Sequence, residues 1–202
     1  RGLGDVYKRQ EQGGEVTVRV IGLVEGQLYT EHLKTKMEVF DGEVRADPKQ
    51  DLLRVCVVER HRHTGRIGKG FVRGFGFREG AIASTVAHDS HNVITVGVSD
   101  LDMCVAVNRL RNIGGGFTVA CDGKVLEEFP LPVAGLMSTK NARESSICMR
   151  RLREAVASLG CKVRAPFMAL SFLALPVIPK LKITDRGLID VEMFKIVNLF
   201  VR

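Results

Sequence analysis

Short apolar segments rich in valine recur between residues 15 and 129, and turn-forming residues separate several of them. Alternating and β-branched residues of this kind favour strands. The segments with this character are 15–24, 52–60, 81–88, 92–98, 117–121 and 124–129. Asp41-Gly42 and Asp122-Gly123 stand between short apolar stretches, as in two-residue hairpins. The chain is therefore expected to build a sheet in which tight turns join neighbouring strands.

Residues 63–80 carry six glycines. Glycine permits positive φ angles and close approach of the backbone, but it weakens the interior of a strand. We therefore predict a loop or an irregular edge strand for this stretch. Phe71, Phe75 and Phe77 alternate within it and are expected to pack in the core rather than to stack on nucleic-acid bases.

Two main helices are predicted in the second half of the chain. Ser99 is placed to cap a helix over residues 100–113, with Asp102 at the acidic position of a capping box. A second helix over residues 140–159 carries an apolar stripe and stops at Gly160.

Residues 166–179 are apolar throughout and bounded by prolines. The run is too short to span a membrane and predicts a buried helix, a strand pair or a domain interface. The tail, residues 190–200, alternates and is expected to close a sheet. Together the elements predict a single α+β domain with a mixed, mostly antiparallel sheet and two main helices. A chain of 202 residues with this pattern does not form a barrel of eight strand–helix units.

Charge and cysteine content restrict the partners. The net charge of +7 is mild for this length, so we expect no nucleic-acid partner. No window approaches 18 consecutive apolar residues, so we expect no membrane partner. The five cysteines include no CxxC pair, which favours a reduced, cytoplasmic setting.

The first ten residues, RGLGDVYKRQ, resemble a translated transposase adapter of the kind used to prepare sequencing libraries. They back-translate to CGT GGG CTC GGA GAT GTG TAT AAG AGA CAG, and the chain does not begin with methionine. We therefore expect residues 1–10 to be a technical scar and residues 11–202 to be the carboxy-terminal piece of a longer reading frame. Without the scar, whose own net charge is +2, the net charge becomes +5.

His61 and His63 directly follow a predicted strand and occupy alternate positions. Two imidazoles at this spacing can turn into one metal site, which His88 and His91 would complete by residue type. However, the barrel that usually carries such a site is absent. We therefore favour two partly exposed histidines at a strand end, and keep a metal site at His61 and His63 as the weaker alternative.

The stretch His88-Asp89-Ser90-His91 lies between two predicted strands. A polar turn there places these side chains together at one edge of the sheet, and a carboxylate such as Asp89 can orient an imidazole. Two interpretations stay open: the four residues form a functional edge, or the polar side chains only satisfy the backbone of a turn.

Four long blocks of sequence carry a resemblance to a known family. The blocks are ERHRHTGRIGKGFVRGFGFREGAIASTVAHDSHNVITVG, DLDMCVAVNRLRNIGGG, FPLPVAGLMS and FLALPVIPKLKITDRGLIDV. In this order they resemble the carboxy-terminal domain of microbial adenine deaminases, which are enzymes of the amidohydrolase superfamily. The resemblance implies that residues 11–24 are a remnant of the junction with the barrel and that residues 25–202 are the carboxy-terminal domain.

The resemblance also implies an activity. The family hydrolyses adenine to hypoxanthine and ammonia in purine metabolism, using a manganese or iron pair. Its metal ligands lie in a histidine-rich motif of an amino-terminal barrel, and nothing in residues 11–202 matches that motif. We therefore transfer no catalytic residue, expect this chain to bind no metal pair by itself, and expect it to be inactive alone.

In the full-length enzyme, the implied partners are adenine and the missing amino-terminal barrel, and a homo-oligomer is possible. We expect His88, Asp89, Ser90 and His91 to face the mouth of the active site, and residues 166–179 to contact the barrel. Two alternatives remain: a deaminase acting on another purine or cyclic amine, and a freestanding purine-binding or structural domain without catalysis.

Overall fold

The computed structural model describes residues 14–201, so the scar assigned to residues 1–10 lies outside the described residues. Within the described part, nine strands form one sheet in the order β3-β2-β1-β5-β4-β7-β6-β8-β9, and three strands form a small second sheet. The strands of the main sheet are β1 (Glu15–Leu23), β2 (Thr30–Phe40), β3 (Glu43–Val44), β4 (Leu53–Val58), β5 (Ile67–Arg73), β6 (Ala81–Ser84), β7 (Val93–Gly97), β8 (Gly116–Cys121) and β9 (Lys124–Pro130). The strands of the small sheet are β10 (Leu181–Thr184), β11 (Gly187–Asp190) and β12 (Lys195–Val197).

The main sheet is mixed and mostly antiparallel, as predicted. Among the strand pairs of residues 14–201, β1 and β5 alone run parallel. Both hairpins form where they were predicted: Asp41-Gly42 joins β2 to β3, and Asp122-Gly123 joins β8 to β9. No barrel is present within the described residues, and the predicted single α+β domain is confirmed.

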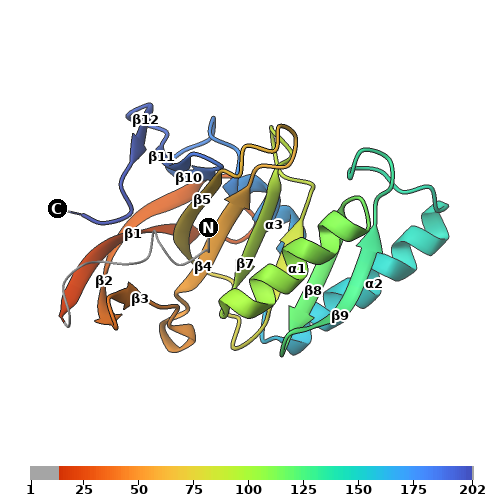
Figure 1. Cartoon of the computed structure of the whole chain (residues 1–202), viewed down its shortest axis with the longest axis horizontal. Coiled ribbons are helices and arrows are strands. Elements are labelled where there is room, and N and C mark those ends of the chain that lie inside the picture. Colours follow the sequence, from red (N-terminus) through yellow and green to blue (C-terminus); the bar gives the residue numbers. More distant parts are fainter. Residues whose placement is uncertain (1–13, 202) are drawn as a thin grey trace.

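Helices cover both faces of the sheet. The α-helices are α1 (Asp100–Asn112), α2 (Ala142–Ser158) and α3 (Pro166–Leu173), and one turn of 3-10 helix, η2 (Pro48–Gln50), precedes β4. Figure 1 shows α1 in front of the sheet and α2 and α3 behind it. Alternation along β6 explains this arrangement, because Ala83 packs with Ala106 of α1 whereas Ile82 belongs to the core shared with α2 and α3.

The predicted start of α1 is confirmed. The Ser99 hydroxyl accepts the backbone N–H of Asp102 at 3.2 Å and donates to the Asp102 carboxylate at 2.7 Å. At the start of α2, Asn141 and Glu144 form a reciprocal capping box. None of the helices in the described part of the chain is long and apolar enough to cross a membrane.

The expectation of two main helices was incomplete, because the apolar run 166–179 begins with a third helix, α3. Pro166 occupies its first turn, where a missing N–H costs nothing. α3 has only eight residues, and its sequence, PFMALSFL, shows no polar face with a period of 3.6. The sequence therefore could not distinguish this buried helix from a strand pair.

The prediction for the glycine-rich stretch 63–80 was wrong in part. Its central residues form β5, which lies between β1 and β4 inside the sheet rather than at an edge. The glycines are needed because the small sheet packs directly on this strand. A Cβ on Gly68 would lie 1.7 Å from the backbone oxygen of Thr184, and a Cβ on Gly70 would lie 2.9 Å from the Leu188 side chain. Phe71, Phe75 and Phe77 are fully buried, as expected.

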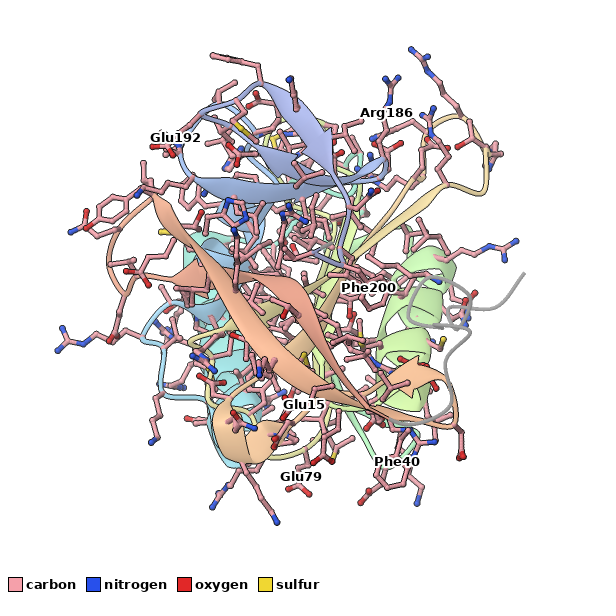
Figure 2. All side chains as sticks on the ribbon, turned by 90° about the vertical axis from the view of Figure 1, so that its left-hand side faces the viewer. Glu15, Phe40, Glu79, Arg186, Glu192 and Phe200 are labelled. Atoms are coloured by element: carbon pink, nitrogen blue, oxygen red, sulfur yellow. The ribbon has the colours of Figure 1, made fainter. Side chains whose placement is uncertain are left out.

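The tail closes both sheets. Part of it forms β12 of the small sheet, and the next residues run along β1 beyond the end of its pairing with β5. The backbone N–H of Arg19 donates to Leu199, and that of Val201 donates to Thr17, both at 2.8 Å. Figure 2 shows Phe200 beneath the small sheet, whose turns carry Arg186 and Glu192. The prediction that this segment closes a sheet is confirmed.

Replacing Gly68 by alanine is expected to lower the free energy of unfolding by about 3 kcal/mol or more, because the new methyl group collides with backbone rather than with a movable side chain. Gly65→Ala is the control, since nothing lies within 4 Å of its Cβ position and only its φ of +70° opposes the change. That control should cost about 1 kcal/mol. Thermal unfolding of the two variants compares them, and equal losses would contradict the close contact.

Candidate functional site

Three loops meet at one edge of the main sheet. They are residues 59–66 after β4, residues 85–92 after β6, and residues 131–137 after β9; together we call them the loop edge. β4, β6 and β9 run in the same direction because antiparallel β7 or β8 lies between them, so their carboxyl ends share this edge. The strand predicted over 81–88 ends at Ser84, which places His88-Asp89-Ser90-His91 in the second of these loops.

Glu59 shapes the first loop. Its carboxylate accepts the backbone N–H of Arg62 at 2.6 Å and of Thr64 at 3.0 Å, the Thr64 hydroxyl at 2.9 Å, and the backbone N–H of His61. The Thr64 backbone N–H and these other donors lower the pKa of Glu59 to about 2, although burial opposes the shift. Glu59 is therefore ionised at neutral pH and holds the histidine-containing loop in one shape.

Arg60 ties the three loops together. Its Nε donates to the backbone oxygen of His91 at 2.6 Å, and its Nη2 donates to that of Ala134 at 2.8 Å. Its backbone N–H donates to the Asn92 side chain at 3.3 Å. Burial lowers the pKa of the Arg60 guanidinium from its ordinary value, and the carbonyl oxygens replace lost water. Sequence reasoning missed Arg60, because its partners lie 31 and 74 residues away in the chain.

The structure brings only one of the two early histidines to the predicted site. His61 Nε2 donates to the backbone oxygen of Ser90 at 2.7 Å, which joins the first loop to the second. His63 is exposed, with a φ of +52°. Across residues 14–201, no three His, Cys, Asp or Glu side chains converge in a way that could hold a metal ion. The described residues therefore do not fit a metal site at His61 and His63.

His88 rests on an aromatic support that the sequence did not reveal. Its ring stacks on Phe172, with centroids 5.2 Å apart and planes 28° apart. Its other neighbour is His91, whose ring lies edge-on at 5.5 Å. Both histidines are half-buried, whereas Asp89 and Ser90 are exposed. The loop edge thus presents a braced imidazole beside an exposed carboxylate and an exposed hydroxyl.

His91 is held in its neutral form. Its Nδ1 accepts the backbone N–H of Ala87 at 3.3 Å, so the proton of the neutral ring lies on Nε2. Burial lowers the pKa of His91 below its ordinary value, and the nearby His88 and Arg60 lower it further. His91 also adopts a φ of +49°, which turns the chain between the second loop and β7.

An apolar groove adjoins the loop edge. Its volume is about 390 Å³, and it lies between residues 23–28, which lead from β1 to β2, and residues 163–172, which include most of α3. Phe172 lines this groove while its ring supports His88. Met168, also in the wall, is 62% exposed. Phe172 therefore contacts both a polar loop and the apolar groove.

The fold and the site define an α+β domain whose polar loops and apolar groove share one end. Residues 14–201 contain no group of side chains that could hold a metal ion. A family model described as the adenine deaminase C-terminal domain matches residues 27–195. The chain belongs to this family, which confirms the resemblance seen in its sequence blocks.

Several curated relatives are similar over nearly the whole chain. An adenine deaminase of Cereibacter sphaeroides is 53% identical over 184 residues, which are 91% of this chain and 33% of that protein. An adenine deaminase of Brucella abortus is 50% identical over 192 residues, covering 95% of this chain and 33% of that protein. One of Oleidesulfovibrio alaskensis is 49% identical over 187 residues, covering 93% and 33%. The chain spans about a third of the length of these relatives.

Acidification is expected to destabilise the protein partly through His91. Its pKa in the folded state is below the ordinary 6.5, so the unfolded chain binds more protons as the pH falls below 6.5 and stability falls through that window. His91→Asn removes the titrating group, and asparagine tolerates the positive φ. The drop in melting temperature between pH 7.5 and pH 5.5 should therefore be smaller in this variant.

His63→Asn is the matched control, because His63 has a similar φ of +52° but is exposed. Its melting temperature should show the same pH dependence as the unchanged protein. If His91→Asn lost as much stability on acidification as the unchanged protein, the assignment of a half-buried, neutral His91 imidazole would be contradicted.

Proposed function

We propose that this chain is the carboxy-terminal portion of an adenine deaminase that hydrolyses adenine to hypoxanthine and ammonia. The observation that supports it is the similarity to proteins named adenine deaminase, at about half identity over more than nine-tenths of the chain. The family match to the C-terminal domain supports the same placement.

In this proposal the metal pair, manganese or iron, belongs to an amino-terminal barrel and not to the present domain. Residues 14–201 hold no cluster of metal-binding side chains, and His61 Nε2 is already committed to the Ser90 carbonyl oxygen. The domain alone is therefore inactive. A cytoplasmic location remains our prediction, supported by five cysteines that are all free thiols. Assembly into a homo-oligomer also remains a prediction.

The contribution of this domain is to close the mouth of the active site with the loop edge. Adenine is planar, carries an exocyclic amine that donates hydrogen bonds, and has ring nitrogens that accept them. The His88 ring, braced by Phe172, offers a flat surface for stacking. The exposed Asp89 carboxylate can accept from an amine, and the exposed Ser90 hydroxyl can donate to a ring nitrogen.

The domain docks on the barrel through the apolar run 166–179. Met168 is 62% exposed and Val177 is 68% exposed, and both belong to this run. Met168 lines the groove, and a large apolar side chain exposed at a groove is typical of an interaction surface. Because Phe172 belongs to the same run, docking there would place the loop edge next to the barrel.

A chimera tests the proposal. Residues 15–202 replace the matching third of the Cereibacter sphaeroides adenine deaminase, and the protein is purified with Mn²⁺. The chimera should release ammonia from adenine, whereas the 202-residue chain alone should not. A folded chimera that deaminates only another purine would favour the alternative substrate. Ammonia release by the chain alone would contradict the division between domains, and a rise in its melting temperature with adenine would favour a freestanding binding module.

In the active chimera, His88→Ala and Asp89→Asn are each expected to lower kcat/KM by about 10- to 100-fold, which is the loss of one or two good contacts to the reacting base. The melting temperature should change little, since Asp89 is exposed and His88 is half-buried. His63→Ala is the control, because it also removes a histidine side chain, but one that is exposed and outside the proposed contacts to adenine. A fall in stability without a fall in kcat/KM would contradict the role of the loop edge.

A further inference from the structure

A lysine is buried between the end of α3 and the loop after β1, and the proposed reaction does not use it. Lys182 lies on β10 and is completely inaccessible to solvent. Its Nζ donates to the backbone oxygen of Leu28 at 2.8 Å and to that of Phe172 at 3.0 Å. These two acceptors come from the opposite walls of the apolar groove, so the side chain joins one wall to the other.

Burial of this amine is costly, and it lowers the pKa of Lys182 to about 8. The amine offsets this cost by donating hydrogen bonds to two backbone oxygens. Phe172 is in the last turn of α3, and the next donor to its oxygen, the N–H of Leu175, is at 3.3 Å. A neutral amine still has two N–H groups, so both bonds persist when the lysine loses its proton.

The hydrogen bond to Phe172 connects Lys182 to the loop edge through a single residue. Lys182 holds the backbone of Phe172, and the ring of Phe172 stacks on His88. The bond to Leu28 prevents the end of α3 from moving away from the loop between β1 and β2.

We propose that Lys182 is a positioning residue for the loop edge: it fixes the end of α3 against residues 24–29 and thereby sets the Phe172 ring beneath His88. The inference rests on the proposed function, because it assigns Lys182 a kinetic effect that passes through His88. It assigns no contact between Lys182 and the substrate.

The test is a double-mutant cycle in the active chimera, with adenine as the substrate. Lys182→Met keeps the unbranched length of the side chain and removes its donors. It should lower kcat/KM by about 10-fold when His88 is present and by less than about twofold when His88 is alanine. The fall in melting temperature should be the same in both backgrounds. A merely structural role would instead change kcat/KM equally in both, or in neither.

Thr118→Val is the matched control. The Thr118 hydroxyl is buried and donates to the backbone oxygen of Ala106 in α1 at 3.1 Å, on the face of the sheet opposite α3. Like Lys182→Met, this substitution removes a buried hydrogen bond from a side chain to a helix carbonyl oxygen. This variant should lower the melting temperature and leave kcat/KM unchanged.

Phe172→Leu tests the same link if Lys182→Met does not fold. It removes the ring beneath His88 but keeps the backbone oxygen that Lys182 binds, and it should lower kcat/KM only when His88 is present. An unchanged kcat/KM in either variant, or equal losses in both backgrounds, would overturn the inference. An inactive unsubstituted chimera would reject the proposed function instead, and an unaffected His88→Ala would reject the role of the loop edge.

Discussion

The close backbone contact between β5 and the small sheet is the constraint on which the functional end of the domain depends. No side chain fits between Gly68 and the backbone oxygen of Thr184, so β10 lies directly against the main sheet. That position carries Lys182 into the interior, where it reaches Leu28 and Phe172. A strand that looks weak by propensity is thus required by packing, because glycine alone permits two sheets to approach this closely.

The loop edge is ordered mainly by charged groups that bind the backbone. The Glu59 carboxylate accepts hydrogen bonds from backbone N–H groups of its own loop. The Arg60 guanidinium donates to carbonyl oxygens of two other loops. Charge-assisted hydrogen bonds of this kind are stronger than neutral ones and are directional. They fix three loops at one edge, where residues 14–201 provide neither a disulfide nor a group of side chains that could hold a metal ion. Asp89 and Ser90 remain at the surface of the ordered loop, where a ligand can reach them.

Local signals in the sequence were sufficient for the hairpins, for the cap of α1 and for the placement of His88-Asp89-Ser90-His91 between two strands. Each of these features depends on residues a few positions apart. The features that were missed depend on distant contacts. The glycines of β5 meet residues of the small sheet more than a hundred positions later, and Phe172 meets His88 across more than eighty positions. Arg60 carries no local pattern that distinguishes it from the surface arginines of the same loop.

In the proposed enzyme, Phe172 links the docking of this domain on the barrel to the ordering of the substrate-facing loop edge. One face of the residue lines the apolar groove, where a docking partner would press on it, and its ring supports His88 at the loop edge. Any partner that favours one position of the α3 end must therefore favour one position of the imidazole, and the dependence is reciprocal. Lys182 reduces the number of positions available to both, because its amine binds the α3 end and the facing loop at once. Docking and the ordering of the substrate-facing edge are then two consequences of the same contact.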